Sequence, residues 1–218
     1  MAIAFDSGNT TTGHVLGSGT ADSWSFTNTA GNFMVLHMLT NTTAASFTVT
    51  YNGVAMSKLG ASITNGTLQS QCYYLVNPAT GANTVSMSWT GASYCYSTAA
   101  SYSGVNTASP IDSNSSNTSA SATTLTASTT VGGSNCWTVT TAMGGNGNNP
   151  SAGAGTTLRS LIALDSFVGI LDSNGTVGTG LQSLIANFSP AQAINMIIFS
   201  IAPAASASSS GNNFFVIF

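Results

Sequence analysis

A period-two alternation of apolar and polar residues is the feature that most constrains what this chain can fold into. In residues 85–89, VSMSW, the first, third and fifth residues are apolar and the two between them are serines. Successive side chains of a strand point to opposite faces, so this pattern predicts a strand with one buried face. Pro78 and Gly81 indicate a turn that separates this strand from the apolar run 72–76 before it.

The same pattern recurs along the chain between short turn signals. Trp24 and Phe26 alternate with polar neighbours, and residues 47–51, FTVTY, do the same. The run 33–39, FMVLHML, is almost continuously apolar, which is typical of a strand that is covered on both faces. Asn52-Gly53 and Asn65-Gly66 predict hairpin turns, because both residue types tolerate a positive φ.

Many short strands with Gly and Asn turns predict an all-β fold, a two-sheet antiparallel β-sandwich with almost no helix. Long connections near 103–122 and 143–158 favour jelly-roll or Greek-key order over a simple meander. A chain of 218 residues is long enough for one sizeable core. We therefore expect a single domain over 1–203, followed by a Ser/Ala-rich tether and an apolar strand over 204–218.

Three segments are expected to depart from the strand pattern, and the end of the chain is expected to form a strand of its own. Residues 113–124, SNSSNTSASATT, predict a surface loop, and 144–155 predict a second, glycine-rich one. Residues 181–186 could form one short helix before Pro190. The end of the chain, Phe214-Phe215-Val216-Ile217-Phe218, would be prone to aggregation if left free. We expect it to pair at a sheet edge, either of its own sandwich or of a neighbouring copy.

Charged residues are scarce and exclude several classes of function. They make up 3% of the chain, against about 25% in ordinary domains. The basic residues are Lys58 and Arg159, the acidic ones are Asp6, Asp22, Asp112, Asp165 and Asp172, and there is no Glu. Two cations cannot supply the basic surface that nucleic acids or anionic membranes require. A nearly neutral surface suits a protein packed in an assembly or fixed on a larger particle, although it is also typical of extracellular proteins.

The cysteines and histidines give no sign of a catalytic or metal site. Cys72, Cys95 and Cys136 lack a paired metal-ligand spacing and have apolar or aromatic neighbours. Buried free thiols are therefore expected, with one disulfide among the three as the alternative. Neither His14 nor His37 has an acid or Cys partner nearby in the sequence, and the apolar neighbours of His37 favour a core position. We expect no enzymatic activity and no cofactor.

Calcium is the one metal that the sequence brings into consideration. Asp172 and Asn174 lie in a DSNG turn, and Asp112 and Asn114 lie in a DSN segment. Both offer the oxygen ligands that Ca²⁺ prefers, but the chain has no Glu to complete a binding loop. An Asx-turn, in which the side chain binds the backbone two residues on, explains both segments more simply.

Aromatic residues raise the alternative of sugar binding. Trp24, Tyr94, Tyr96 and Trp137 could provide stacking faces for a glycan if they were exposed. The simpler interpretation is that aromatic residues at alternating positions fill the core, since Trp89 is in phase with Val85 and Met87.

Four blocks of the sequence resemble a known group of modules. They are YNGVAMSKLG at 51–60, YYLVNPATGANTVSMSW at 73–89, ASYSGVNTASPID at 100–112 and MIIFSIAP at 196–203. Together they resemble a widespread group of β-sandwich modules found in bacteriophage structural proteins and in secreted bacterial proteins. The resemblance implies a concanavalin-like or jelly-roll sandwich with an adhesive or structural role, and it implies no catalytic residues.

The start of the chain, MAIAFD, lacks the basic and apolar regions of a secretory signal, which favours the phage interpretation. We therefore expect a non-enzymatic virion structural protein, made in the host cytoplasm, that decorates or cements a capsid or belongs to a tail. Its partners would be identical copies or capsid or tail proteins, with Phe214–Phe218 as the best candidate contact. The alternatives are an adhesin or carbohydrate-binding module on the cell surface, and the subunit of an extracellular filament.

Overall fold

The computed structural model describes residues 1–9, 14–16, 20–40, 46–91, 95–145, 150–163 and 167–205. The described part of the chain contains strands and no helix, so the predicted all-β antiparallel sandwich is confirmed. The strands are β1 (Ala4–Gly8), β2 (His14–Leu16), β3 (Ala21–Asn28), β4 (Phe33–Thr40), β5 (Ser46–Tyr51), β6 (Val54–Ala55), β7 (Ser57–Asn65), β8 (Leu68–Val76), β9 (Gly81–Thr90), β10 (Cys95–Ser103), β11 (Ile111–Val131), β12 (Trp137–Gly144), β13 (Ser151–Ala152), β14 (Thr157–Ala163), β15 (Phe167–Asp172) and β16 (Gly180–Ile201). Among these residues, no helix is present that could cross a bilayer.

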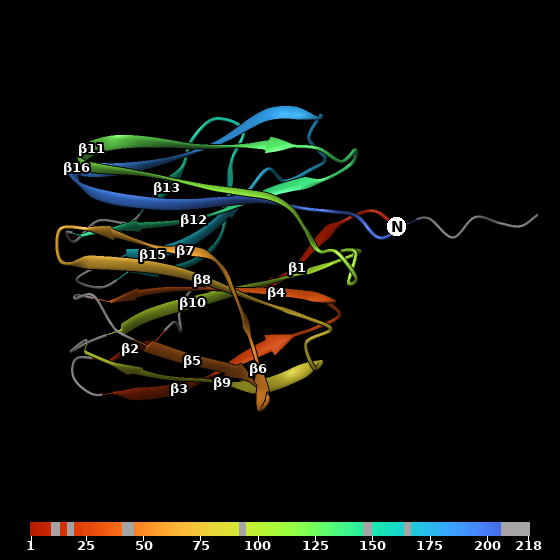
Figure 1. Ribbon diagram of the computed structural model, residues 1–218, viewed down its shortest axis with the longest axis horizontal. Coiled ribbons are helices and arrows are strands. Elements are labelled where there is room, and N and C mark those ends of the chain that lie inside the picture. The colour runs from red at the N-terminus through yellow and green to blue at the C-terminus, as the bar shows by residue number, and fades with distance from the viewer. Residues whose placement is uncertain are drawn as a thin grey trace, which may run out of the picture.

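Three sheets are stacked, where the sequence predicted two (Figure 1). The central sheet has the order β1-β10-β4-β8-β7, with β2 paired to β10. The small sheet, β3-β9-β5-β6, covers one of its faces, and the large sheet, β11-β16-β12-β15-β14 with β13 on β16, covers the other. Every ladder is antiparallel.

Strand β4 shows why a third layer is needed. All eight of its residues are buried, as the continuous apolar run predicted. Met34 and Leu36 belong to the core shared with the small sheet, around Trp24 and Val85. Phe33 and its alternating neighbours belong to the core shared with the large sheet. A strand that is apolar on both faces has to be covered on both faces, and the central sheet is therefore the middle layer.

The two longest strands double back and add an outer layer to the large sheet. β11 and β16 pair from Ile111 with Ile201 to Val131 with Gly180, and the register shifts between Ser119 and Thr124. The Thr129 hydroxyl donates to the Ser113 hydroxyl at 3.0 Å, so the second half of β11 lies back against the first. Residues 122–131, 180–187 and β13 form this outer layer, visible at the top of Figure 1. Its inward side chains build a further apolar cluster on the large sheet.

Two expectations for this region are wrong. Residues 113–124 belong to β11 and are not a surface loop, because the backbone ladder with β16 organises them despite their polar composition. Residues 181–186 belong to β16 and are not a helix. Leu184 and Ala186 are buried, whereas Ile185 between them is half-buried and Ser183 before them is exposed. This alternation is the period of a strand.

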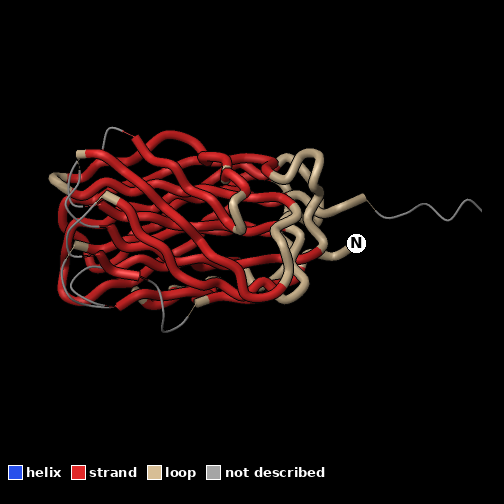
Figure 2. The backbone as a smooth tube through the Cα atoms, turned by 90° about the horizontal axis from the view of Figure 1, so that it is seen from below, coloured by secondary structure: helices blue, strands red, loops and turns tan. Residues whose placement is uncertain are grey.

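Both ends of the described chain lie at one end of the strands, where most of the described loops gather (Figure 2). The amide of Ala204 donates to the Gly104 carbonyl at 2.8 Å, and the Met1 ammonium donates to the Ala204 carbonyl at 2.9 Å. The predicted partner contact Phe214–Phe218 lies outside the described residues.

Candidate functional site

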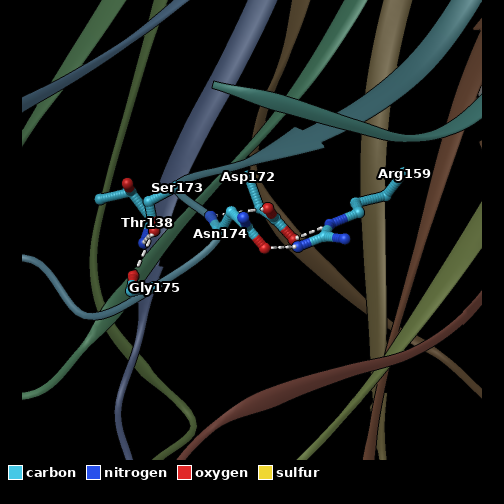
Figure 3. Close-up of polar contacts among 6 residues, drawn as sticks. All are labelled: Thr138, Arg159, Asp172, Ser173, Asn174 and Gly175. Atoms are coloured by element: carbon cyan, nitrogen blue, oxygen red, sulfur yellow. Dashed lines mark hydrogen bonds and ion pairs between the residues drawn. The ribbon is translucent and has the colours of Figure 1, made fainter. Parts of the chain in front are cut away.

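A charged cluster lies at the turn after β15 (Figure 3). Arg159 Nε donates to Asp172 Oδ2 at 2.7 Å, and Arg159 Nη2 donates to Asn174 Oδ1 at 2.6 Å. The Asn174 amide donates to Asp172 Oδ1 at 2.9 Å. The Asp172 side chain is fully buried and that of Arg159 is 15% exposed. The side-chain oxygens of Asp172 and Asn174 are therefore all engaged within the chain.

The contacts of Asp172 and Asn174 are those of a turn closed by hydrogen bonds within the chain. The bond from the Asn174 amide to Asp172 closes an Asx-turn, and the φ of 49° at Asn174 suits a residue type that tolerates the left-handed region. A cation placed here would face the guanidinium of Arg159 at hydrogen-bond distance from the same oxygens. An Asx-turn therefore accounts for the contacts of Asp172 and Asn174.

The cluster ties four strands together. The Arg159 guanidinium lies 4.5 Å from the centre of the Phe5 ring, a cation–π contact between β14 and β1. Phe5 packs edge-on against Tyr102 of β10, with ring centroids 5.9 Å apart. Burial raises the pKa of the Tyr102 hydroxyl well above its ordinary value, and the neighbouring Asp172 carboxylate raises it further. The tyrosine therefore stays neutral, and the cluster stabilises the junction between strands.

Asp112 and Asn114, the second calcium candidate, make separate contacts within the chain. The Asp112 carboxylate accepts from the amides of Gly132 and Gly133 at 2.9 and 3.1 Å. It also accepts from the Ser200 hydroxyl at 2.7 Å. Asn114 instead turns toward β7, since a Cβ added to Gly60 would lie 3.2 Å from its Oδ1 atom. Asp112 thus fastens the doubled-back strand, and no group of three His, Cys, Asp or Glu side chains converges anywhere among the described residues.

A buried Ser–His pair lies between the central and large sheets. His37 Nε2 and Ser70 Oγ are 2.7 Å apart, and both residues have no exposed surface. Burial lowers the pKa of His37 to about 3, against a smaller opposing effect of the Gly169 backbone. A neutral histidine could in principle activate a serine, but no substrate can reach a pair enclosed between two sheets. The predicted core position of His37 is confirmed.

A polar band continues from this pair through the same interface. The hydroxyls of Thr98 and Ser160 are hydrogen-bonded to each other, and Ser160 also donates to the Asn9 carbonyl at 2.7 Å. All of these side chains are buried. The band therefore consists of internal polar contacts and does not form an open site.

The aromatic residues proposed for glycan stacking are core residues. Trp24, Tyr96 and Trp137 are only 8%, 5% and 8% exposed, so the prediction that they offer stacking faces is wrong. The Trp24 indole donates to Ser97 Oγ at 2.9 Å inside the core. Trp89 is buried in phase with Val85 and Met87, which confirms the core interpretation. Tyr94 lies outside the described residues.

The three cysteines are free and buried. Burial raises the pKa of the Cys72 and Cys95 thiols, and it is also the largest cause of the raised pKa of Cys136. Thiols held in the protonated form are poor nucleophiles. The expectation of buried free thiols is confirmed, and the alternative of a disulfide among them is not realised.

The outward surface of the small sheet and the outward surface of the outer layer, at the two ends of the stack, are both rich in hydroxyl groups. No sequence motif pointed to these surfaces. On the small sheet, the outward side chains are hydroxyl-bearing and exposed: Ser23, Ser25, Thr27, Ser46, Thr48, Thr84, Ser86, Ser88 and Thr90. On the outer layer, the outward positions include Thr124, Thr126, Ser183 and Thr130, together with Leu181, which is 71% exposed. Neither set contains a charged residue. The signal was present in the sequence as the polar half of each alternating strand.

Three comparisons, with protein-family models, with curated proteins and with solved structures, find no match to this chain.

Proposed function

We propose that the chain is a non-enzymatic structural protein of a bacteriophage virion, acting as a capsid decoration or cement protein or as a tail-associated component. The observation that carries the proposal is the pair of uncharged, hydroxyl-rich faces at opposite ends of the stack. Such faces can approach a second protein without desolvating charge, which is the costly part of forming an interface. On this proposal the protein is made in the host cytoplasm and works on the virion, and its partners are identical copies or a capsid or tail protein.

The size of these faces indicates how they would be used. Three strands of about eight residues cover roughly 400 Å² at the usual strand spacing and rise. A stable interface buries about 800 Å² on each partner. One such face is therefore too small to hold a free dimer, but many copies on a repeating shell can bind together through avidity. This favours a protein that decorates an array.

The choice of a virion draws on the resemblance of the blocks at 51–60, 73–89, 100–112 and 196–203 to phage structural modules. The glycan-binding alternative is weaker, because Trp24, Tyr96 and Trp137, the aromatic residues that motivated it, are buried. The filament alternative keeps its basis, because contacts between two opposite faces of successive copies would propagate without closing.

The test is binding of the purified protein to candidate capsids, with light scattering and negative-stain imaging of the protein alone. A variant with Ser25→Lys and Ser86→Lys places two ammonium groups on the exposed small-sheet face. A control with Thr107→Lys and Ser109→Lys adds the same charge to an exposed loop. We expect wild type and control to bind alike and the face variant to lose binding, since buried unpaired charge is expensive.

Equal binding by all three proteins would contradict the use of this face. A clean monomer at high concentration that binds no capsid would contradict the structural role itself. Open filaments seen by imaging would favour the filament subunit, and specific binding on a glycan array would favour the adhesin.

A further inference from the structure

Four Asn-Gly pairs occur in the chain, at 52–53, 65–66, 146–147 and 174–175. Asparagine is one of the thermolabile residue types, and a following glycine leaves its own backbone nitrogen open to reaction because it has no Cβ. The pair at 146–147 lies outside the described residues. The other three pairs share one chemistry, so any difference in their reactivity comes from the fold around them.

Asn52 and Gly53 form the tip of the hairpin between β5 and β6. Their φ values of 49° and 76° are those of a type I′ turn. Both residues are exposed, and a Cβ added to Gly53 would meet nothing within 4 Å. Within the part of the chain that the structure describes, the Asn52 side chain makes no hydrogen bond. Its backbone amide donates to the Thr84 carbonyl at 2.9 Å, so the backbone is held while the side chain can rotate.

Few contacts keep this tip closed. β6 consists of two residues, Val54 and Ala55, which are both exposed and pair with the end of β5. Segments with few buried contacts and exposed backbone hydrogen bonds open locally at a low free-energy cost. An opened tip allows the Gly53 nitrogen to approach the side-chain carbon of Asn52.

Asn65 has the same neighbour in the sequence but is held by its side chain. Its Nδ2 atom donates to the carbonyls of Ser119 and Ile194, at 2.6 and 3.2 Å. The residue is half-buried and pairs with Leu68 in the ladder between β7 and β8. Turning its side chain toward Gly66 would break both of these hydrogen bonds, which join the central sheet to the large sheet.

Asn174 is the closer match to Asn52, because both are exposed and both have a φ of 49°. Here the side chain is bound, since Asn174 Oδ1 accepts from Arg159 Nη2 at 2.6 Å. The Asn174 amide also donates to Asp172 Oδ1 at 2.9 Å. The turn at Asn174 is therefore fixed by a charged cluster that the turn at Asn52 lacks.

We propose that Asn52 is a site of spontaneous modification, at which the folded protein converts asparagine to aspartate and isoaspartate, and that the fold protects Asn65 and Asn174. The Gly53 backbone nitrogen attacks Asn52 Cγ. A bond from this nitrogen to Cγ forms, the bond from Cγ to Nδ2 breaks, and Nδ2 leaves as ammonia with the proton that the Gly53 nitrogen gives up. Water then opens the five-membered succinimide. Opening at Cγ gives aspartate, and opening at the backbone carbonyl carbon gives isoaspartate.

Either product places a carboxylate at the edge of the small sheet. The formal net charge of the chain is −3, and the modification makes it one unit more negative. The new charge lies beside Thr84, which is exposed on the hydroxyl-rich face. The inference goes beyond the proposed function and does not depend on it.

The test is peptide mapping by mass spectrometry of the full-length protein during incubation at mildly alkaline pH. In the folded protein, we expect Asn52 to convert about tenfold or more faster than Asn65 and Asn174, because those two must first lose side-chain hydrogen bonds. In urea, the three should convert at similar rates, since they share the same glycine neighbour. Equal rates in the folded protein would overturn the proposal. Protection of Asn52 in the folded protein, over a time in which the unfolded protein converts fully, would overturn it too.

A matched variant gives a second measurement that needs no peptide mapping. The background is Asn146→Gln, which removes the pair outside the described residues, and the variant adds Asn52→Gln. Glutamine reacts more slowly, because the ring that it would form has six members. Ion-exchange chromatography should show a more acidic form accumulating in the background protein and a loss of most of that form in the variant. Accumulation at the same rate in both proteins would place the modification elsewhere and contradict the proposal.

Discussion

The central sheet meets two different interfaces on its two faces. Toward the small sheet, Leu36 and its neighbours pack with Trp24, Val85 and Met87 in a mainly apolar core. Toward the large sheet, apolar clusters are interrupted by the polar band around His37 and Ser70 and are bordered by the buried pair of Arg159 with Asp172. The two faces of one sheet thus use different physical chemistry. The first depends on packing, whereas the second depends in addition on charge and protonation.

This difference indicates which interface is more sensitive to substitutions and to acid. An apolar interface responds to lost volume in proportion to the atoms removed. A buried charge or histidine is stable only while its partners and protonation state are kept. We expect the interface with the large sheet to be the one that single substitutions and acid break first.

The largest effect is expected from Arg159→Met. This change leaves the fully buried Asp172 carboxylate without its cation, and breaking a buried pair costs about 3–5 kcal/mol. Adding Asp172→Asn to the variant removes the stranded charge but keeps an oxygen for the Asn174 amide, so most of the loss should be recovered. Urea unfolding of the two single variants and the double variant measures the coupling. Additive losses would contradict a charge pair that matters for stability.

A matched pair of leucines on β4 measures packing alone. Leu36 and Leu39 have no exposed surface, and they face the small and the large sheet respectively. Each change to Ala should cost about 2–5 kcal/mol through lost burial and the cavity left behind. We expect similar costs for the two, because the interfaces differ in their polar groups and not in packing. A difference above about 2 kcal/mol in urea unfolding, comparable to the spread at fixed chemistry, would contradict this.

Acid should act through His37. Its pKa is about 3 in the folded protein and 6.5 ordinarily, so between these values the unfolded chain binds a proton that the folded chain does not. Unfolding is then favoured as the pH falls below 6.5, by up to about 1.4 kcal/mol per pH unit. Between pH 6.5 and 4.5 the loss is about 2–3 kcal/mol.

The control is His37→Gln, which removes the titration and keeps a polar group near Ser70. Urea unfolding at pH 7.5, 6.0 and 4.5 should show a smaller loss on acidification for the variant than for wild type. All other residues are the same in the two proteins, so the difference between their profiles reports on position 37. Parallel pH profiles would show that His37 does not set the acid sensitivity.

The interface with the small sheet was easier to predict from the sequence than the other. Trp24 and Phe26 alternate with polar residues, and the alternation gives the buried face directly. The run 33–39 indicated cover on both faces, but which strands supply the second cover depends on pairings between distant segments, such as Ile111 with Ile201. A polar edge strand such as 113–124 carries no apolar period, so only its partner reveals it. The burial of Asp172 likewise follows from neighbours on other strands.

The smallest effects should come from one chemical change made in both interfaces. Ser97→Ala removes the acceptor of the Trp24 indole N–H, and Ser70→Ala removes the partner of His37. Leaving a buried polar group unsatisfied costs about 1–3 kcal/mol. Trp24 is 8% exposed whereas His37 has no exposed surface, so water can replace the lost partner more readily at Trp24. We therefore expect Ser97→Ala near the lower end of that range and Ser70→Ala near the upper end. Thermal and urea unfolding of the two variants at pH 7.5 measures this, and a larger loss for Ser97→Ala would reverse the assignment of the more sensitive interface.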